Sequence, residues 1–279
     1  MMPLHHVAVR DTRLAVHTRG GGLPLLLLHA FPLDHSMWER QAPLADSLRL
    51  IAPDQRGFGA SRGSPPQSIE QLADDAVALL DALHVAAPAV VCGVSMGGYV
   101  AQHVATRHPD RVAALVLVDT KLEADTPEAR AGRADLAAKV GRLGPSILAD
   151  AMVPRLLAAA TPAPAADRAD VEDLLRRTIT TQPVDTIQAA LAALGARPDM
   201  TDAMRRVRVP TLLVVGAEDA ITPPACMEAA MQVLPGARLL VVPGAGHMTP
   251  LERPDVFNAS LLEFLREALP AGHPHQGRP

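Results

Sequence analysis

The chain has 279 residues, 48% of them hydrophobic, and its 26 basic and 30 acidic side chains give a net charge of −4. This length can bury a large core and suits one α/β domain with an insertion or two smaller domains, and the hydrophobic content excludes general disorder. The sequence has no Lys/Arg stripe of the kind that tracks a phosphate backbone, so nucleic acid is not expected as a partner. Two cysteines are too few for a disulfide framework or a thiolate zinc site.

The start of the chain lacks a basic segment followed by an apolar stretch, and the apolar run Leu23–Leu28 is too short to span a bilayer. A cytoplasmic protein with no membrane partner is therefore expected. Residues 270–279 are expected to form a flexible tail.

The segments His5–Arg10 and Arg13–Thr18 alternate polar and apolar residues around Asp11-Thr12, a pattern typical of a β-hairpin. After them, short continuous apolar runs alternate with helical patterns, which indicates a parallel sheet covered on both faces. The predicted strands of this sheet are Leu25–Leu28, Leu50–Ala52, Ala89–Cys92, Val112–Val118, Thr211–Val215 and Arg238–Val242.

Two helices of this core carry start signals. Ser68 and Gln71 have the spacing of a capping box, and apolar residues follow at helical spacing as far as Leu83. Pro254 can occupy the first turn of the last helix, where its missing N–H costs little.

Residues 121–206 break the alternation of strands and helices, because they are rich in alanine and contain no convincing strand. We predict that they form a helical cap, inserted into a core made by residues 1–120 and 207–269. The cap is divided into about four helical pieces at Gly144-Pro145, Thr161-Pro162-Ala163-Pro164 and Gln182-Pro183.

Ser95 lies in the hexapeptide Gly-Val-Ser-Met-Gly-Gly of residues 93–98, between a predicted buried strand and a helix-like run. A serine on such a tight strand-to-helix turn projects its hydroxyl above the sheet, and only small residues fit at the flanking positions, here Gly93 and Gly97. Ser95 is therefore the candidate nucleophile.

A serine hydroxyl needs a base within hydrogen-bond reach and a third group that orients the base. His247 is the candidate base, since it follows a predicted strand in a glycine-containing loop, and Asp219, after another strand, is the candidate acid. Asp119 also follows a strand and is the alternative acid, while Glu218 is less favoured because adjacent loop side chains point in different directions. A histidine bonded only to backbone, and an aspartate that only caps a turn, remain the alternative interpretations.

Stabilising an oxyanion requires two backbone donors, one from the residue after the nucleophile and one from the loop after an early strand. Met96 and Phe31 occupy these positions. In the loop after residues 50–52, Asp54 and Arg56 are expected to brace each other and the following turn rather than to act in catalysis.

The chain order Ser95, Asp219, His247 matches the Ser…Asp…His order of α/β-hydrolases. With this order and these motifs, the chain resembles the α/β-hydrolase superfamily from roughly Val7 to Leu269. The matching stretches are His29–Asp34, Pro53–Ser61, Gly93–Gly98, Gly216–Asp219 and Gly246-His247.

The resemblance implies an α/β-hydrolase fold, with a mostly parallel eight-stranded sheet, helices on both faces and an inserted helical cap. It also implies Ser95, Asp219 and His247 as the catalytic triad. Ala30 is a departure, since the family usually has glycine there. The stretches Asp34–Trp38 and Gly246–Pro254 resemble those of capped bacterial esterases and 3-oxoadipate enol-lactonase-like hydrolases.

The expected function is hydrolysis of a small-molecule carboxylic ester or lactone by a monomer or homo-oligomer, with no cofactor and no metal. Trp38 and Tyr99 lie near the motifs in sequence and are candidate walls of a substrate pocket, with core packing as the alternative. An enol-lactonase, a C–C bond hydrolase and a cofactor-free perhydrolase or haloperoxidase would use the same triad. A non-catalytic ligand-binding module on this fold is a further alternative.

Overall fold

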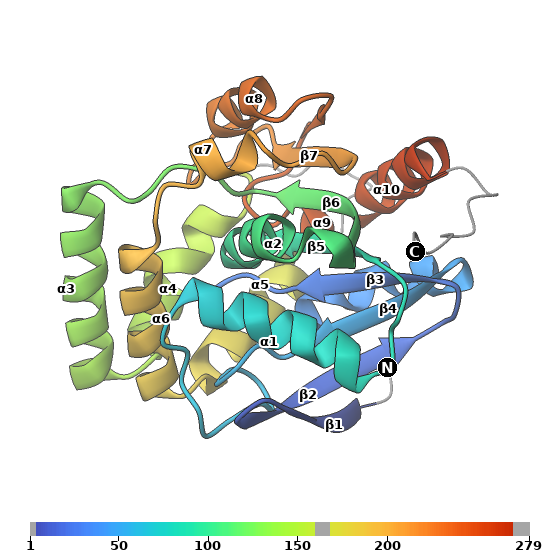
Figure 1. The fold of residues 1–279 in the computed structure, drawn as a ribbon. Helices are drawn as coiled ribbons and strands as arrows, with labels where there is room; N and C mark the ends of the chain where they lie inside the picture. The colour runs from blue at the N-terminus through green and yellow to red at the C-terminus, as the bar shows by residue number, and fades with distance from the viewer. Residues whose placement is uncertain (1–3, 160–167, 270–279) are drawn as a thin grey trace.

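The computed structural model describes residues 4–159 and 168–269 (Figure 1). The tail predicted at 270–279 and the helix break predicted at 161–164 lie outside the described residues. The described strands are β1 (Leu4–Val9), β2 (Thr12–Arg19), β3 (Leu23–Leu28), β4 (Leu48–Pro53), β5 (Ala89–Val94), β6 (Val112–Val118), β7 (Thr211–Gly216) and β8 (Arg238–Val242).

These strands form one sheet in the order β1-β2-β4-β3-β5-β6-β7-β8, so the predicted eight-stranded, mostly parallel sheet is confirmed. The predicted hairpin is β1 and β2, and β2 also pairs antiparallel with β4. All other neighbours pair in parallel. The inner strands β5 and β7 each have a strand on both sides and are buried along their whole length, which explains why their sequences are continuous apolar runs.

Helices pack against this sheet, with α1 and α2 side by side in front of it in Figure 1. The Ser68 hydroxyl caps α1 by accepting a hydrogen bond from the Gln71 N–H. In a full capping box the Gln71 side chain would also accept a hydrogen bond from the Ser68 N–H. Here Gln71 Oε1 accepts from the Gln67 N–H instead. The helices of the core are η1 (His35–Asp46, a 3-10 helix), α1 (Ile69–Ala82), α2 (Met96–Arg107), η2 (Pro109–Arg111, also 3-10), α8 (Pro224–Val233), α9 (Thr249–Glu252) and α10, which begins as predicted at Pro254 (Pro254–Ala268).

Among the described residues, five helices lie between β6 and β7 in the chain, and we refer to this part of the chain as the helical insertion. Figure 1 shows α3, α4 and α6 to one side of the sheet, with α3 and α6 next to each other, whereas α7 lies beside α8. The predicted divisions at Gly144-Pro145 and Gln182-Pro183 coincide with helix ends. The helices are α3 (Pro127–Leu143), α4 (Ser146–Leu156), α5 (Arg168–Thr181), α6 (Val184–Ala196) and α7 (Thr201–Met204).

The helical insertion is bonded to the loop that follows β4. Gln182 Oε1 accepts a hydrogen bond from the Gly59 N–H at 2.9 Å, and the Thr186 hydroxyl donates to the Gly57 carbonyl at 3.2 Å. Because α6 begins beside these contacts, this loop fixes one end of the insertion relative to the sheet.

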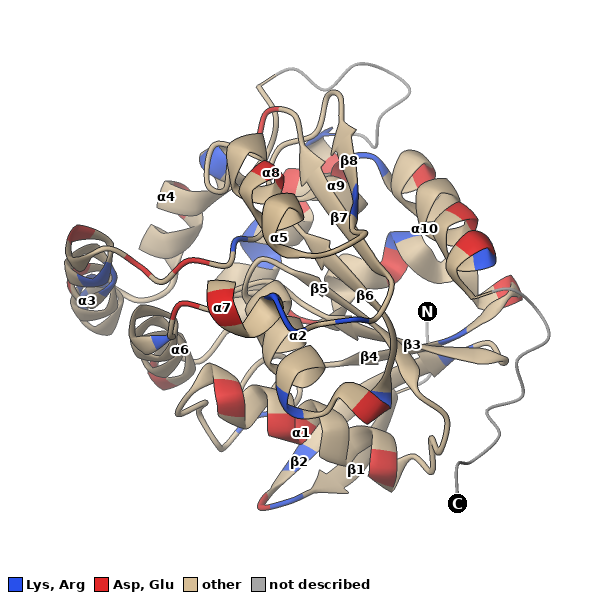
Figure 2. Cartoon of the chain, turned by 45° about the horizontal axis from the view of Figure 1, so that its top comes forward, with Lys and Arg blue, Asp and Glu red and all other residues tan. Residues whose placement is uncertain are grey.

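Charged positions of both signs are distributed over the outer helices. Figure 2 shows acidic and basic residues interspersed along α3 and α10. No helix within the described part of the chain has the length and apolar character that crossing a membrane requires.

Candidate active site

Ser95 lies on the turn between β5 and α2. Its φ of 52° falls in the left-handed region, which is strained for any residue other than glycine. A Cβ on Gly97 would lie 2.0 Å from the carbonyl oxygen of Leu28, so the start of α2 touches β3 directly. The turn is held by a hydrogen bond from the Thr120 hydroxyl to the Ser95 carbonyl at 2.9 Å, and the Ser95 side chain is only partly buried.

His247 and Asp219 form a buried hydrogen-bonded pair. His247 Nδ1 lies 2.8 Å from Asp219 Oδ2, and the two side chains come from loops after the adjacent strands β8 and β7. Asp219 also accepts hydrogen bonds from the N–H of Ile221 and from the N–H and hydroxyl of Thr222, all within 2.9 Å. These bonds hold the carboxylate in one orientation toward the imidazole.

The two members of this pair shift each other's pKa values. Burial would raise the pKa of Asp219, but its hydrogen bond with His247 and the charge of that ring keep the pKa below the usual 3.8. Burial would lower the pKa of His247, but the hydrogen bond and charge of Asp219 raise it above 6.5. The arrangement therefore stabilises an imidazolium, which is the form that a general base becomes when it takes a proton.

Asp119, the alternative acid, has other partners. Its carboxylate accepts hydrogen bonds from the Gly216 N–H and from the N–H and hydroxyl of Thr249, each at 3.0 Å. Burial, together with the nearby charge of Asp219, raises the pKa of Asp119 to about 7. Of the two aspartates, Asp219 is the one that binds the imidazole of His247. Glu218 is exposed and accepts from the Ala159 N–H instead.

Phe31 and Met96 lie at the ends of the neighbouring parallel strands β3 and β5, where Leu28 is in register with Gly93. Met96 is the first residue of α2, so its N–H belongs to the helix end that leaves donors unpaired. No described residue accepts a hydrogen bond from either N–H. Both donors are thus available at the same edge of the sheet as Ser95. Ala30, the departure from the family pattern, is fully buried, and its N–H donates to Met37 Sδ.

The two candidate pocket residues lie in different surroundings. Trp38 is completely buried in η1 and packs against Phe257 of α10, with ring centroids 6.5 Å apart, which favours the core-packing alternative for this residue. Tyr99 follows Ser95 by one helical turn and is 6% exposed. The guanidinium of Arg197, just after α6, lies 4.1 Å from the centre of its ring, so Tyr99 contacts the helical insertion.

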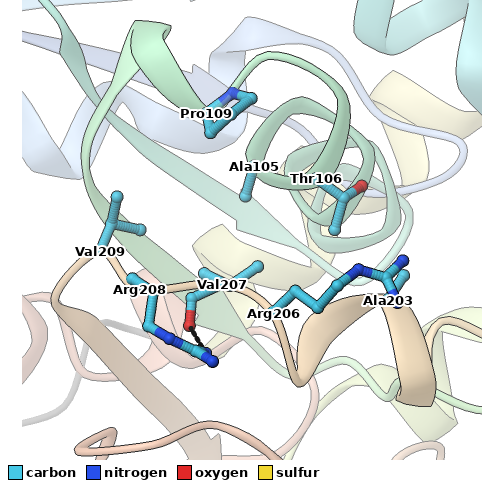
Figure 3. Close-up of a pocket in the computed structure, with 8 residues that line it drawn as sticks. All are labelled: Ala105, Thr106, Pro109, Ala203, Arg206, Val207, Arg208 and Val209. Atoms are coloured by element: carbon cyan, nitrogen blue, oxygen red, sulfur yellow. Dashed lines mark hydrogen bonds between the residues drawn. The ribbon is translucent and has the colours of Figure 1, made fainter.

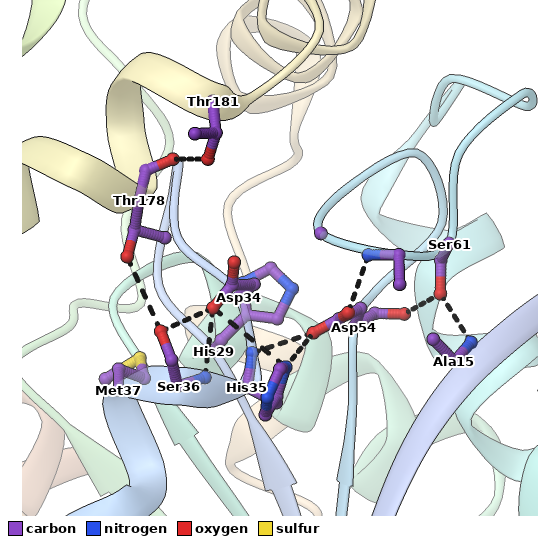
Figure 4. Close-up of polar contacts among 12 residues, drawn as sticks. Ala15, His29, Asp34, His35, Ser36, Met37, Asp54, Ser61, Thr178 and Thr181 are labelled. Carbon is purple, nitrogen blue, oxygen red and sulfur yellow. Dashed lines mark hydrogen bonds and ion pairs between the residues drawn. The ribbon is translucent and has the colours of Figure 1, made fainter. Parts of the chain in front are cut away.

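Asp54 and Arg56 do not brace each other, contrary to the sequence-based expectation. Arg56 forms ion pairs with Asp75 of α1 and with Asp11 of the hairpin turn, both at 2.6 Å. Asp54 Oδ2 accepts a hydrogen bond from the Ala60 N–H, and Asp54 Oδ1 lies 2.7 Å from His35 Nδ1 (Figure 4). The expected structural role remains, because both side chains tie the loop after β4 to its neighbours.

His17, His35 and Asp54 bring three potential metal ligands within 4.8 Å of one another. The two imidazole rings are stacked, with centroids 3.4 Å apart and planes 9° from parallel. Since imidazole lone pairs lie in the ring plane, stacked rings do not direct both nitrogens at one ion. This group does not fit a metal site in the observed arrangement.

The polar network around Asp54 continues toward the helical insertion. Figure 4 shows Ser36 between Asp34, at 2.6 Å, and the hydroxyl of Thr178 in α5, at 3.4 Å. The Gln182 and Thr186 contacts attach the insertion to the loop after β4. The contact between Ser36 and Thr178 is a second attachment, to the start of η1 after β3.

A cavity of about 320 Å³ lies at the far end of α2 from Ser95 (Figure 3). Ala105, one of its lining residues, is nine residues beyond Met96, which along an α-helix is roughly 14 Å. In its wall, the Arg208 guanidinium donates to the Val207 carbonyl. The cavity is therefore separate from the candidate nucleophile.

Glu252 also lies at this site, although the sequence patterns did not single it out as a functional residue. It lies five residues after His247 and accepts hydrogen bonds from the N–H groups of Gly246, Met248 and Ala158. In the sequence, the signal that could have pointed to Glu252 is its position in the stretch Gly246–Pro254, which carries part of the family resemblance. Sequence spacing does not reveal which backbone N–H groups a buried carboxylate binds.

A serine on a left-handed turn after β5, followed along the chain by a hydrogen-bonded aspartate and histidine after β7 and β8, defines the class of α/β hydrolases. The comparisons with known proteins agree. The family model for the alpha/beta hydrolase fold matches residues 24–254, so the chain belongs to this family.

Relatives of the chain include several kinds of enzyme. It is 38% identical to a thermophilic esterase from Thermogutta terrifontis, with a TM-score of 0.90 and coverage of 95% of this chain and 99% of that one. It is 29% identical to 3-oxoadipate enol-lactonase 2 of Acinetobacter baylyi, over 95% of this chain and 99% of the relative. A bromoperoxidase from Bacillus anthracis, 22% identical with a TM-score of 0.82 and coverage of 95% and 100%, shares the fold.

Proposed function

We propose that the protein is a serine hydrolase that cleaves a small carboxylic ester or lactone through an acyl-enzyme on Ser95. The observation that carries the proposal is the buried 2.8 Å hydrogen bond between His247 and Asp219 on strand ends of the same sheet that bears the strained Ser95 turn. This pair supplies what a serine lacks on its own, a base that is oriented and electrostatically supported.

In the proposed acylation step, the Ser95 hydroxyl attacks the substrate carbonyl carbon while His247 Nε2 takes its proton. The Met96 and Phe31 N–H groups donate hydrogen bonds to the oxygen that becomes negative. His247 then gives the proton to the departing alkoxide, which leaves as an alcohol or, from a lactone, remains attached as a hydroxyl group. Water attacks the acyl-enzyme by the same route and releases the acid.

The proposed substrate class rests on the relatives together with the site. An esterase at 38% identity and an enol-lactonase at 29% identity both cover nearly the whole chain, and both names describe carboxylic ester bonds. We also propose that residues 121–206 act as a cap that shapes the substrate pocket, supported by the contact of Arg197 with Tyr99 one turn beyond Ser95.

Replacement of Ser95 by alanine tests the mechanism. The variant should fold normally and lose about 10⁶-fold in kcat if serine, histidine and aspartate act as a unit. The measurement is hydrolysis of short p-nitrophenyl esters and of simple lactones, with circular dichroism as the control for folding.

A fluorophosphonate probe provides an independent test, since it should label the wild-type protein at Ser95 and leave Ser95→Ala unlabelled. Near-wild-type ester hydrolysis by Ser95→Ala would end the proposed mechanism. Peracid formation from acetate and peroxide, faster than ester or lactone hydrolysis, would instead favour a perhydrolase.

A further inference from the structure

The carboxylate of Glu252 binds the backbone on both sides of His247. Glu252 is only 3% exposed, and its Oε1 accepts hydrogen bonds from the Gly246 N–H at 2.8 Å and from the Met248 N–H at 3.3 Å. Its other oxygen, Oε2, accepts from the Ala158 N–H at 2.7 Å, just beyond the end of α4. One side chain therefore joins the loop of the candidate base to the helical insertion.

The two backbones are also in direct contact. The His247 N–H donates to the Leu156 carbonyl at 2.8 Å. A Cβ on Gly246 would lie 2.6 Å from the Ala158 nitrogen and 2.7 Å from the Leu157 carbonyl carbon, closer than side-chain carbons approach such atoms. The histidine loop and the end of α4 thus leave no space between them at this point.

A carboxylate is the group that this position requires. All three partners of Glu252 are N–H donors, and a carboxylate offers two oxygens that only accept. A glutamine of the same shape would turn its NH₂ toward at least one of these N–H groups. Burial raises the pKa of Glu252 although the three N–H groups act in the opposite direction.

We propose that Glu252 is a positioning residue that couples the end of α4 to His247, so that the helical insertion sets the orientation of the base as well as covering the site. The inference rests on the proposed function, in which His247 is the base. A change in the position of α4, for example on binding a substrate beneath the insertion, would reach the imidazole through Glu252 and the Leu156 carbonyl.

The test compares Glu252→Gln with Asp75→Asn. Asp75 is a matched control, since it is 2% exposed and its carboxylate pairs with Arg56 and Arg10 rather than with the loop of His247. Glu252→Gln should lower kcat for ester hydrolysis by about 10²-fold, the loss expected when a catalytic group is displaced by roughly 1 Å. KM should change by much less, and Asp75→Asn should keep its kcat at a temperature where both variants are folded.

Two measurements test the coupling without activity. In Glu252→Gln, amide hydrogen exchange should accelerate together at Gly246–Met248 and around Ala158, and Asp75→Asn should leave both segments protected. The low-field proton resonance of His247 Nδ1–H, assigned by its loss in His247→Ala, should broaden or shift in Glu252→Gln alone.

A lowered melting temperature with kcat and the Nδ1–H resonance unchanged would overturn the proposal and leave Glu252 a structural residue. If Glu252→Gln does not fold, Glu252→Asp, which shortens the reach to Ala158, takes its place with the same readouts. A wild-type protein that hydrolyses neither esters nor lactones would overturn the proposed function, whereas the exchange and resonance measurements would still test the coupling.

Discussion

Two buried aspartates lie near His247, and their partners separate their roles. Asp219 binds the imidazole and has its pKa lowered, whereas Asp119 binds the backbone of two loops and has its pKa raised to about 7. Asp119 joins Gly216, just before the Asp219 loop, to Thr249, just after His247. It therefore connects the two loops of the pair, and its hydrogen bonds go to Gly216 and Thr249 rather than to the ring.

Substitution of each aspartate by asparagine should separate these roles. Asp219→Asn removes the charge that orients and stabilises the imidazolium, so kcat for a p-nitrophenyl ester should fall by about 10⁴-fold. Asp119→Asn should reduce kcat far less, because Asp219 remains bonded to His247. The reverse ranking in steady-state assays of the two purified variants would assign the acid to Asp119.

At the scale of elements, the site depends on backbones that approach one another closely. The start of α2 lies against the end of β3 at Gly97, and the histidine loop lies against the end of α4 at Gly246. Glycine is needed at both positions because the backbones approach too closely for a side chain. A methyl group at Gly97 or Gly246 would collide with backbone atoms.

Replacement of Gly97 by alanine should destabilise the protein severely and distort the Ser95 turn, because the new Cβ would meet the Leu28 carbonyl oxygen at 2.0 Å. Gly132, inside α3, is the matched control, as a Cβ there has nothing within 4 Å. Gly132→Ala should stabilise the protein by up to about 1 kcal/mol through helix propensity. Urea unfolding of both variants measures the difference, and equal stabilities would contradict the close approach of α2 and β3.

Much of this arrangement could be predicted from the sequence, because each candidate residue directly follows a recognisable apolar strand. The sequence favours Asp219 over Asp119, but both aspartates follow strands, and the hydrogen bond of Asp219 to the His247 ring is seen only in the structure. The partners of Arg56 were missed for a related reason. Asp75 and Asp11 lie on a helix and a hairpin turn that the sequence places in no spatial relation to the loop after β4.

At the scale of the whole molecule, Asp119 should make stability depend on pH. Its pKa is about 7 in the folded protein and 3.8 for a free side chain, so the folded state favours the protonated form. The stabilisation by this group is fully present below pH 3.8 and is lost as pH rises through about 7. Above that pH, folding must keep a buried negative charge next to Asp219.

The free energy of unfolding in urea, measured at pH 5 and pH 8, tests this expectation. The decrease in stability between the two values should be larger for the wild-type protein than for Asp119→Asn, which cannot ionise. For each protein, the change in the free energy of unfolding between pH 5 and pH 8 is compared, not the stability at one pH. Asparagine also loses one of the hydrogen bonds that the carboxylate accepts, which lowers the stability of the variant at both pH values. A decrease of the same size in both proteins would show that Asp119 does not titrate in this range.

The order of the strands along the chain has a consequence for synthesis. The turn of Ser95 is complete once β6 has been made, but the proposed acid and base follow β7 and β8, with the whole helical insertion in between. The ribosome therefore adds the proposed nucleophile to the chain more than a hundred residues before the proposed base. Without a base the hydroxyl is unreactive, so a nascent or truncated polypeptide should not acylate itself in the presence of substrate. The fluorophosphonate probe should therefore label only full-length chains.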